Sequence, residues 1–283
     1  MAKRYGVPYM GSKNKIAQWL IDKLPSSEVF VDLFAGGCAV THAAIESGKY
    51  QEYVVNDIGN APDIFIDAIH GKYKDETRWI SREDFFRLKD VDPYVKYCWS
   101  FGNQGNDYLY GKEIEPYKKA LHYARVFGDY SLLKAIGINT TDASRKWIKD
   151  HDSEIRTALK NGASKSLERL QSLQSLQSLE RLERLEIYNL SYEQVKIPVN
   201  AVVYCDIPYK STNSYFSEFD YDKFYNWCRK QQGMIFISEY EMPDDFYLVA
   251  EFERCSLLSQ HSRKKVSEKL YCNKPYCFKT GGD

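Results

Sequence analysis

The chain has 283 residues, enough for one large domain or for a core domain that carries an insertion. Its 39 basic and 39 acidic residues give a formal net charge of zero, which does not favour a nucleic-acid-binding protein with the usual basic excess. No apolar run approaches the roughly 20 residues of a membrane span, and the seven cysteines show no paired CxxC spacing. We therefore expect a reduced cytoplasmic protein without a membrane segment, a zinc site or a disulfide framework.

The opening segment combines a short polar stretch with a helix. Tyr9-Met10-Gly11-Ser12-Lys13 is followed by apolar residues at helical spacing, from Ile16 to Leu24. Ser12 is the expected N-cap and Pro25 the expected stop. A glycine, a hydroxyl group and a lysine at a helix start can hold an anionic group through backbone N–H donors and positive charge.

The next segment has the pattern of a site for a nucleoside-containing cofactor. An apolar strand that starts at Val29 runs into Asp32-Leu33-Phe34-Ala35-Gly36-Gly37, and a helix follows. The glycines let the backbone come close to a ligand, and the helix N-terminus faces it. A second strand ends in Asp57, about 20 residues after the glycines, where an acid can bind ribose hydroxyls. The turn is not GxGxxG, which argues against a dinucleotide.

From Ala61 to Gly162 the chain changes character and predicts a helical region rich in polar and aromatic residues. Within it, the loop from Cys98 to Tyr108 concentrates glycines, amides and aromatic rings. Such a composition is typical of a recognition surface, and a surface loop without a ligand is the alternative.

Residues 167–185 form a low-complexity repeat with a leucine at every third position. An α-helix turns about 100° per residue, so each leucine steps back by about 60° and seven of them surround the axis. The repeat therefore predicts neither an amphipathic stripe nor a heptad seam. We interpret it as an expanded three-residue repeat in a helical connector or a loop, whose number of units can change without loss of activity.

A strand from Val202 to Cys205 then ends in Asp206-Ile207-Pro208-Tyr209. Pro208 cannot continue a central strand, so a carboxylate and an aromatic ring stand where the chain leaves the sheet. Ligands of open α/β sheets bind outside the carboxyl ends of the strands. The pair suits a flat polar ligand such as a nucleobase, and a plain Pro-Tyr turn is the alternative.

The remaining pattern alternates strands with helices and predicts a mostly parallel sheet. The expected elements are a strand over 185–190, a helix over 221–230, and strands over 234–240, 248–258 and 269–278.

With these motifs in this order, the sequence resembles the Dam-like (D12 class) adenine-specific DNA methyltransferases, of the type found in phages and mobile elements. The stretch 9–13 matches the N-terminal cofactor motif, 32–37 the glycine-rich motif, Asp57 the ribose acid and 206–209 the catalytic D-P-P-Y motif. The resemblance covers residues 5–59 and 185–278.

The resemblance implies an α/β fold, with a Rossmann-like methyltransferase sheet that has helices on both faces and an inserted, mainly helical target-recognition region. It implies a cofactor-binding half over residues 1–59, the insertion over 60–184, and the D-I-P-Y half over 185–283. The implied activity moves the methyl group of S-adenosylmethionine to the N6 amine of adenine in double-stranded DNA, after the base is flipped out.

The resemblance also implies the roles of individual residues. The catalytic residues are Asp206, Pro208 and Tyr209: the carboxylate and the Pro208 carbonyl accept N–H bonds from the amine, and Tyr209 stacks on the base. The implied cofactor-binding residues are Tyr9, Lys13, Asp32, Phe34, Ala35, Gly36, Gly37, Asp57, Asn189 and Asp206. The candidate DNA-binding residues are Lys210, Asn103, Tyr108 and Lys264. No metal is expected.

Three positions depart from the family pattern. Ile207 replaces the first proline of D-P-P-Y, Cys38 stands where a further glycine is common, and Asn189 replaces an acid near the cofactor adenine. We expect an active, monomeric enzyme, solitary or paired with a cognate restriction enzyme. A catalytically silent cofactor- or DNA-binding relative is one alternative, and an amino-methyltransferase acting on cytosine N4 or RNA is another.

Overall fold

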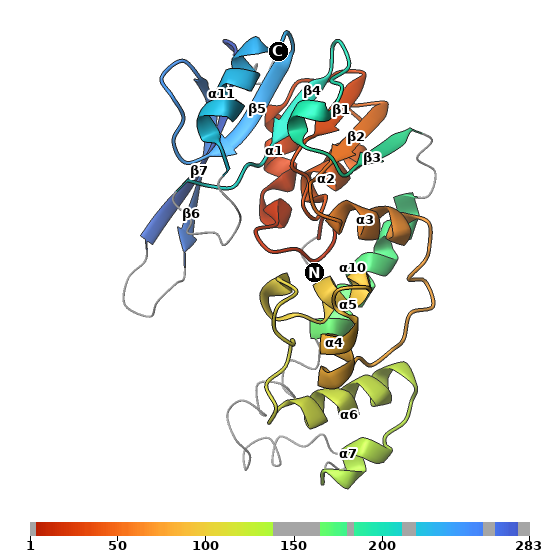
Figure 1. Cartoon of the computed structure of the whole chain (residues 1–283). Coiled ribbons are helices and arrows are strands. Elements are labelled where there is room, and N and C mark those ends of the chain that lie inside the picture. The colour runs from red at the N-terminus through yellow and green to blue at the C-terminus, as the bar shows by residue number, and fades with distance from the viewer. Residues whose placement is uncertain (1–3, 138–164, 180–183, 211–218, 257–263, 277–283) are drawn as a thin grey trace, which may run out of the picture. The chain divides into compact units, whose positions relative to one another are not determined.

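The computed structural model describes residues 4–137, 165–179, 184–210, 219–256 and 264–276, with the backbone alone for 254–256 and 264–266 (Figure 1). The chain divides into two compact units. Unit 1 consists of residues 1–6, 12–63 and 182–283, and unit 2 consists of residues 7–11 and 64–181. None of the helices described has both the length and the apolar character that crossing a bilayer requires.

Unit 1 is organised around a seven-stranded sheet with the strand order β3-β2-β1-β4-β5-β7-β6. Neighbouring strands from β3 to β5 are parallel, whereas β7 is antiparallel to both β5 and β6. The strands are β1 Val29–Asp32, β2 Glu52–Asn56, β3 Leu185–Tyr188, β4 Val202–Cys205, β5 Met234–Glu239, β6 Tyr247–Ser256 and β7 Lys264–Cys272. The predicted α/β class and the mostly parallel sheet are confirmed.

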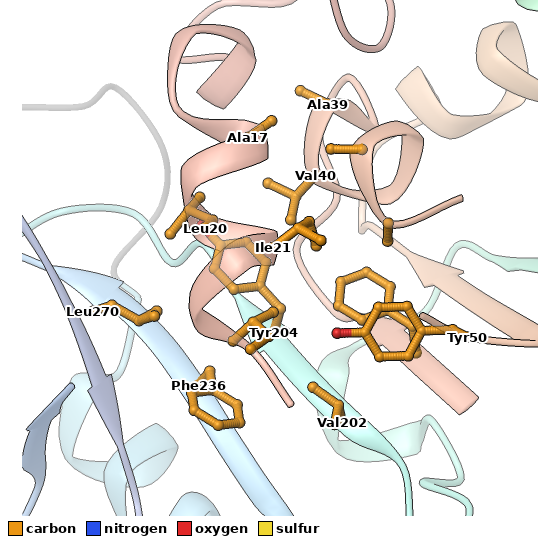
Figure 2. Close-up of a cluster of buried hydrophobic side chains, with 14 of the residues drawn as sticks. Ala17, Leu20, Ile21, Ala39, Val40, Tyr50, Val202, Tyr204, Phe236 and Leu270 are labelled. Atoms are coloured by element: carbon orange, nitrogen blue, oxygen red, sulfur yellow. The ribbon is translucent and has the colours of Figure 1, made fainter. Parts of the chain in front are cut away.

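Helices cover both faces of this sheet. One face packs against α1 (Ala17–Lys23) and α2 (Ala39–Ser47), and the other against α11 (Tyr221–Lys230). Successive strand residues point to opposite faces, so Tyr204 joins the first core and Val203 the second. Figure 2 shows the first core, between the two helices and the sheet. Burial on both faces explains the continuous apolar run of β4.

The N-cap predicted at Ser12 belongs to a 3₁₀ turn, η1 (Lys13–Lys15), rather than to α1. The Ser12 hydroxyl accepts a hydrogen bond from the Asn14 amide at 3.3 Å, and α1 starts later, at Ala17. This extra turn leaves Lys13 only 9% exposed. Its ammonium group is therefore held inside unit 1, where a charge needs a partner.

The last strand differs from the sequence prediction. It starts at Lys264 rather than Lys269 and ends at Cys272, and the predicted end at Phe278 lies outside the described residues. Asn273 follows the strand: its backbone amide still donates to the Ile235 carbonyl at 3.1 Å, but the Ile235 amide donates to the Asn273 side-chain Oδ1 at 2.9 Å.

Unit 2 is helical over its described residues and has an aromatic core. Trp99 is fully buried, and its ring contacts those of Trp79 and Tyr110, with centroids 5.0 and 6.4 Å away. A bridge between Ser100 and Tyr108 closes the loop between them. The elements are α4 Arg82–Leu88, α5 Pro93–Cys98, η2 Phe101–Asn103, α6 Glu115–Val126, α7 Ser131–Ala135, α10 Lys165–Ser175 and η3 Leu176–Leu179; α3 (Ala61–Ile69) crosses the boundary between the units, and η4 (Tyr192–Gln194) belongs to unit 1.

The described part of the leucine repeat forms α10 and η3. Its leucines at positions 167, 170, 173 and 176 are buried, so the prediction of a repeat without a buried stripe is wrong for this part. Four leucines that step by about 60° cover only about half of the circumference. In the 3₁₀ turn, a period of three keeps successive leucines on one face. Residues 180–183, which continue the repeat, lie outside the described residues.

Candidate active site

Three carboxylates stand at one edge of the sheet. Asp32 ends β1, Asp57 follows β2, and Asp206 follows β4. These strands are adjacent and parallel, so their carboxyl ends meet at the same edge. The strand-end acids predicted from the sequence are thereby brought together.

Asp32 is the most enclosed of the three, with 1% of its surface exposed. Its Oδ2 accepts a hydrogen bond from the Thr41 hydroxyl at 2.7 Å, whereas Oδ1 is buried without a hydrogen-bond partner among the described residues. Burial raises the pKa of Asp32 to about 7; the Thr41 bond opposes the rise, and the charges of Asp206 and Asp57 add to it. An acceptor left open in this way suits a cationic or N–H-bearing ligand.

Asp57 ties the glycine turn to the loop that follows β2. Its Oδ2 accepts from the Gly36 amide and its Oδ1 from the Gly59 amide, both at 2.8 Å. Burial raises the pKa of Asp57, and these two amide bonds oppose the rise. The Asn189 side chain donates to the Gly59 carbonyl at 2.7 Å, so the side chains of Asn189 and Asp57 both hydrogen-bond to Gly59. A carboxylate can accept about four bonds, which leaves capacity for ligand hydroxyls.

The glycine turn has a left-handed backbone at two positions. Gly36 has φ +47°, and Cys38, at the N-cap of α2, has φ +58°. A side chain at that φ is strained, which explains why glycine suits this position better than Cys38. Gly6 packs against the same turn, and a Cβ there would lie 2.2 Å from the Gly37 carbonyl oxygen. The turn is thus closely enclosed from one side.

The two residues between Leu33 and the glycines lie against the ends of the strands. Ala35 donates its amide to the Asn56 carbonyl at 2.9 Å and is 9% exposed. The Phe34 ring packs against those of Tyr192 and Phe224, each with centroids 5.6 Å away. Phe34 is therefore part of an aromatic cluster on the α11 side of the sheet.

Asn56 holds this edge together and was not singled out by the sequence. Its side-chain amide donates to the carbonyls of Leu33 and Leu190 at 3.0 and 3.1 Å, and its Oδ1 accepts from the Leu190 amide at 3.0 Å. It is 1% exposed. A polar residue directly after the apolar run of residues 53–55 was the available signal.

Lys13 and Asp206 form the central ion pair. The Lys13 ammonium lies 2.7 Å from Asp206 Oδ1, 3.9 Å from Glu268 Oε2 and 4.6 Å from the centre of the Tyr209 ring. Burial raises the pKa of Asp206, and the Lys13 ammonium opposes that rise. Glu268 sits in β7, 5% exposed, in a stretch where no sequence pattern distinguished it.

The segment after Asp206 is fixed residue by residue. Ile207 is 2% exposed and packs in the second core. The Tyr221 hydroxyl donates to the Pro208 carbonyl at 2.9 Å. The rings of Tyr209 and Tyr240 meet edge to face, with centroids 4.6 Å apart. The segment therefore leaves the sheet in a defined conformation.

Glu239, at the end of β5, fixes the next residue. Its Oε1 accepts from the Tyr240 amide at 2.7 Å and its Oε2 from the Lys210 amide at 3.3 Å. Burial raises the pKa of Glu239, and these amide bonds oppose the rise. Glu239 was missed, although it carries the signal that identified Asp206, an acid at the end of a buried strand.

The predicted DNA-binding residues have different environments. Tyr108 is 4% exposed, and its hydroxyl donates to the Ile80 carbonyl at 2.7 Å, so the prediction that its side chain contacts DNA is corrected. Asn103 is partly exposed, with φ +60°. Lys210 is exposed, its ammonium 5.2 Å from the centre of the Tyr221 ring. Lys264 begins β7, and its side chain lies outside the described residues.

Tyr9, Asn103 and Tyr108 belong to unit 2, whereas the three carboxylates belong to unit 1. The Tyr9 ring contacts that of Tyr97, with centroids 5.7 Å apart.

Among the described residues, no three His, Cys, Asp or Glu side chains are arranged to hold a metal ion.

Comparison with known proteins gives one family. The model of the D12 class N6 adenine-specific DNA methyltransferases matches residues 9–241, which include all three carboxylates and Glu239. A search of curated proteins returned no match.

Proposed function

We propose, from the premise that the chain belongs to the D12 class N6 adenine-specific DNA methyltransferase family, that its methyl donor is S-adenosylmethionine. Membership of this family makes the chain an enzyme that methylates adenine in DNA. The proposal concerns the methyl donor, the double-stranded state of the DNA and the roles of individual residues. The observation that carries it is the row of carboxylates at the ends of β1, β2 and β4.

These carboxylates fit the proposed donor, which carries a sulfonium and an ammonium group. Asp32 Oδ1 is a buried acceptor to which an ammonium could donate, and Asp57 keeps acceptor capacity for ribose hydroxyls. Ile58, next to Asp57, is 86% exposed and offers apolar surface to a purine ring. The other proposed donor contacts are Tyr9, Phe34, Ala35, Gly36, Gly37 and Asn189. Lys13 is assigned to Asp206 instead, because the two already pair at 2.7 Å.

When bound, the donor supplies an electrophilic methyl group. An exocyclic amine is a poor nucleophile, because its lone pair is delocalised into the ring. The Asp206 carboxylate and the Pro208 carbonyl can accept its two N–H bonds and favour a tetrahedral nitrogen. The Pro208 carbonyl keeps a second lone pair beside the bond from Tyr221, and the Asp206 carboxylate would take the proton that the amine loses. The Tyr209 ring would stack on a base flipped out of double-stranded DNA.

We assign target recognition to unit 2 and DNA contacts to Asn103, Lys210 and Lys264. Asn103 and Lys210 are at least partly exposed and carry groups that bind bases or phosphates. Positioning and electrostatics, rather than covalent catalysis, would supply most of the rate.

The test removes the Asp206 carboxylate. Asp206→Ala is expected to lower methyl transfer by at least about 100-fold while calorimetry still detects S-adenosylmethionine binding. Asp222→Ala, at an exposed position in α11, is the matched control. Product is measured by digesting treated DNA, free of methylated bases, to nucleosides. Undiminished N6-methyladenine from Asp206→Ala would refute the assignment, and N4-methylcytosine would favour the alternative amino group.

A further inference from the structure

Glu239 is a buried acid whose place in the fold is not explained by packing. It is 2% exposed at the carboxyl end of β5, the strand beside β4. Burying a carboxylate costs several kcal/mol unless hydrogen bonds compensate, whereas an apolar side chain would fill the same space without that cost. The Glu239 carboxylate makes two hydrogen bonds that an apolar side chain could not make.

Both hydrogen bonds go to the backbone beside the proposed catalytic ring. Lys210, whose amide donates to Oε2 at 3.3 Å, directly follows Tyr209. Tyr240, whose amide donates to Oε1 at 2.7 Å, presents its ring edge to face against Tyr209 at 4.6 Å. One carboxylate therefore fixes the backbone on both sides of this ring pair.

A second tether holds the same segment from α11. The Tyr221 hydroxyl donates to the Pro208 carbonyl at 2.9 Å, and the Lys210 ammonium lies 5.2 and 5.5 Å from the ring centres of Tyr221 and Tyr225. From the ion pair at Asp206 to the bonds at Lys210, the segment is held by η1, β5 and α11. Its conformation therefore depends on residues outside the segment, Glu239 among them, as well as on the buried side chain of Ile207.

We propose that Glu239 is a positioning residue for methyl transfer, which sets the Tyr209 ring and the Pro208 carbonyl in place through the amides of Lys210 and Tyr240. The inference rests on the proposed function of Asp206, Pro208 and Tyr209. The role concerns the amine and the base rather than the donor, because within the described residues Glu239 hydrogen-bonds to the amides of Lys210 and Tyr240 and not to the loops of Asp32 and Asp57.

The expected signature is a loss of turnover without a loss of donor affinity. A glutamine at position 239 can accept only one of the two amide bonds and turns an N–H group toward the other. Glu239→Gln should lower kcat by about 10- to 100-fold, the effect of a small misplacement of reacting groups. The KM and the calorimetric Kd for S-adenosylmethionine should stay within about 2-fold of the wild-type values. The matched control is Glu241→Gln, an exposed position two residues on.

A second variant tests the same positioning role if the Glu239→Gln protein fails to fold. Tyr240→Leu keeps the backbone amide bond and removes only the ring that contacts Tyr209, so it should also lower kcat and leave the donor Kd unchanged. Wild-type kcat in the folded variants, or a fall in kcat matched by an equal loss of donor affinity, would overturn the positioning role. If the wild type and Glu241→Gln themselves form no N6-methyladenine, the proposed function fails, and the inference with it.

Discussion

At the scale of single residues, Ile207 shows how the chain supports a departure from D-P-P-Y. A proline stiffens a loop through its fixed φ, whereas Ile207 anchors the loop by burying its side chain in the second core. The proposed chemistry uses the carboxylate, the Pro208 carbonyl and the Tyr209 ring, and none of these belongs to residue 207.

The anchoring separates stability from activity. Ile207→Pro should keep turnover within about 3-fold of wild type and lower the free energy of unfolding by about 1–3 kcal/mol, because proline fills less of the core. Ile207→Ala should cost about 2–5 kcal/mol. Urea unfolding measures the stability and radioactive methyl incorporation the activity. A Pro variant that is stable but inactive would show that residue 207 itself matters to the chemistry.

Asp32 gives unit 1 a pH dependence of known sign. Its folded pKa of about 7 exceeds its ordinary value of 3.8, so the folded state holds more protons between these values. The free energy of unfolding should therefore fall as pH rises from about 4 to 7, by about 4 kcal/mol at most. Donor affinity should rise over the same range, as the carboxylate ionises.

Asp32→Asn tests this dependence, because the amide oxygen still accepts the Thr41 bond. Its unfolding free energy, measured from pH 5 to pH 8, should lack the fall that the wild type shows. Donor affinity should become weak and independent of pH. An equal dependence of the unfolding free energy on pH in the two proteins would show that a group other than Asp32 titrates.

At the scale of elements, α10 supports the loop that precedes α6. Arg169 donates to the carbonyls of Cys98 and Ser100 at 2.7 and 2.9 Å. Tyr110, after that loop, donates its hydroxyl to the Ser166 hydroxyl at 3.1 Å. The repeat helix therefore braces the proposed recognition loop at both of its ends.

Deleting residues 171–179 should accordingly unfold part of unit 2. The deletion removes the buried side chains Leu173 and Leu176 and the bonds from Gln174 to the Tyr73 and Lys74 carbonyls. We expect a loss of several kcal/mol in stability and a loss of DNA methylation. Calorimetric unfolding and a methylation assay check both. Wild-type stability and turnover would instead restore the expectation of a dispensable repeat.

The bounds of an element could be predicted from the sequence where capping residues and the spacing of apolar side chains determine them. The helix predicted over 221–230 is α11 with the same bounds, because Asp220 caps it and an aromatic face follows. Ser12 was misplaced, because a 3₁₀ turn and an α-helix share the same cap residues. The repeat was misread because burial depends on its neighbours in space, which its period does not reveal.

At the scale of the whole molecule, the site follows from the sheet. The acids at residues 32, 57 and 206 were predicted from strand ends, because parallel topology brings such ends together. The environments of Glu268 and Tyr108 depend on tertiary packing. Glu268 lies on an antiparallel strand near Lys13, and Tyr108 is a buried loop residue. No local pattern separates such residues from their neighbours.

The net charge of zero leaves DNA binding to depend on local basic residues, of which Lys210 is one candidate. Lys210→Ala should lower the slope of log K against log salt by about 1. Lys230→Ala is the control, since α11 ends there and the chain then enters the start of β5, at the opposite edge of the sheet. Fluorescence anisotropy at several salt concentrations measures both slopes. An unchanged slope would remove Lys210 from the interface.

The leucine repeat also limits the insertions and deletions that this chain can absorb. Gaining or losing one Ser-Leu-Gln unit keeps a leucine at every third position of the repeat. In an α-helix one unit turns the following residues by about 60° and shifts them by about 4.5 Å, whereas in a 3₁₀ turn it returns them to the same face. One unit gained or lost within η3 should therefore disturb the buried leucine face less than one gained or lost within α10.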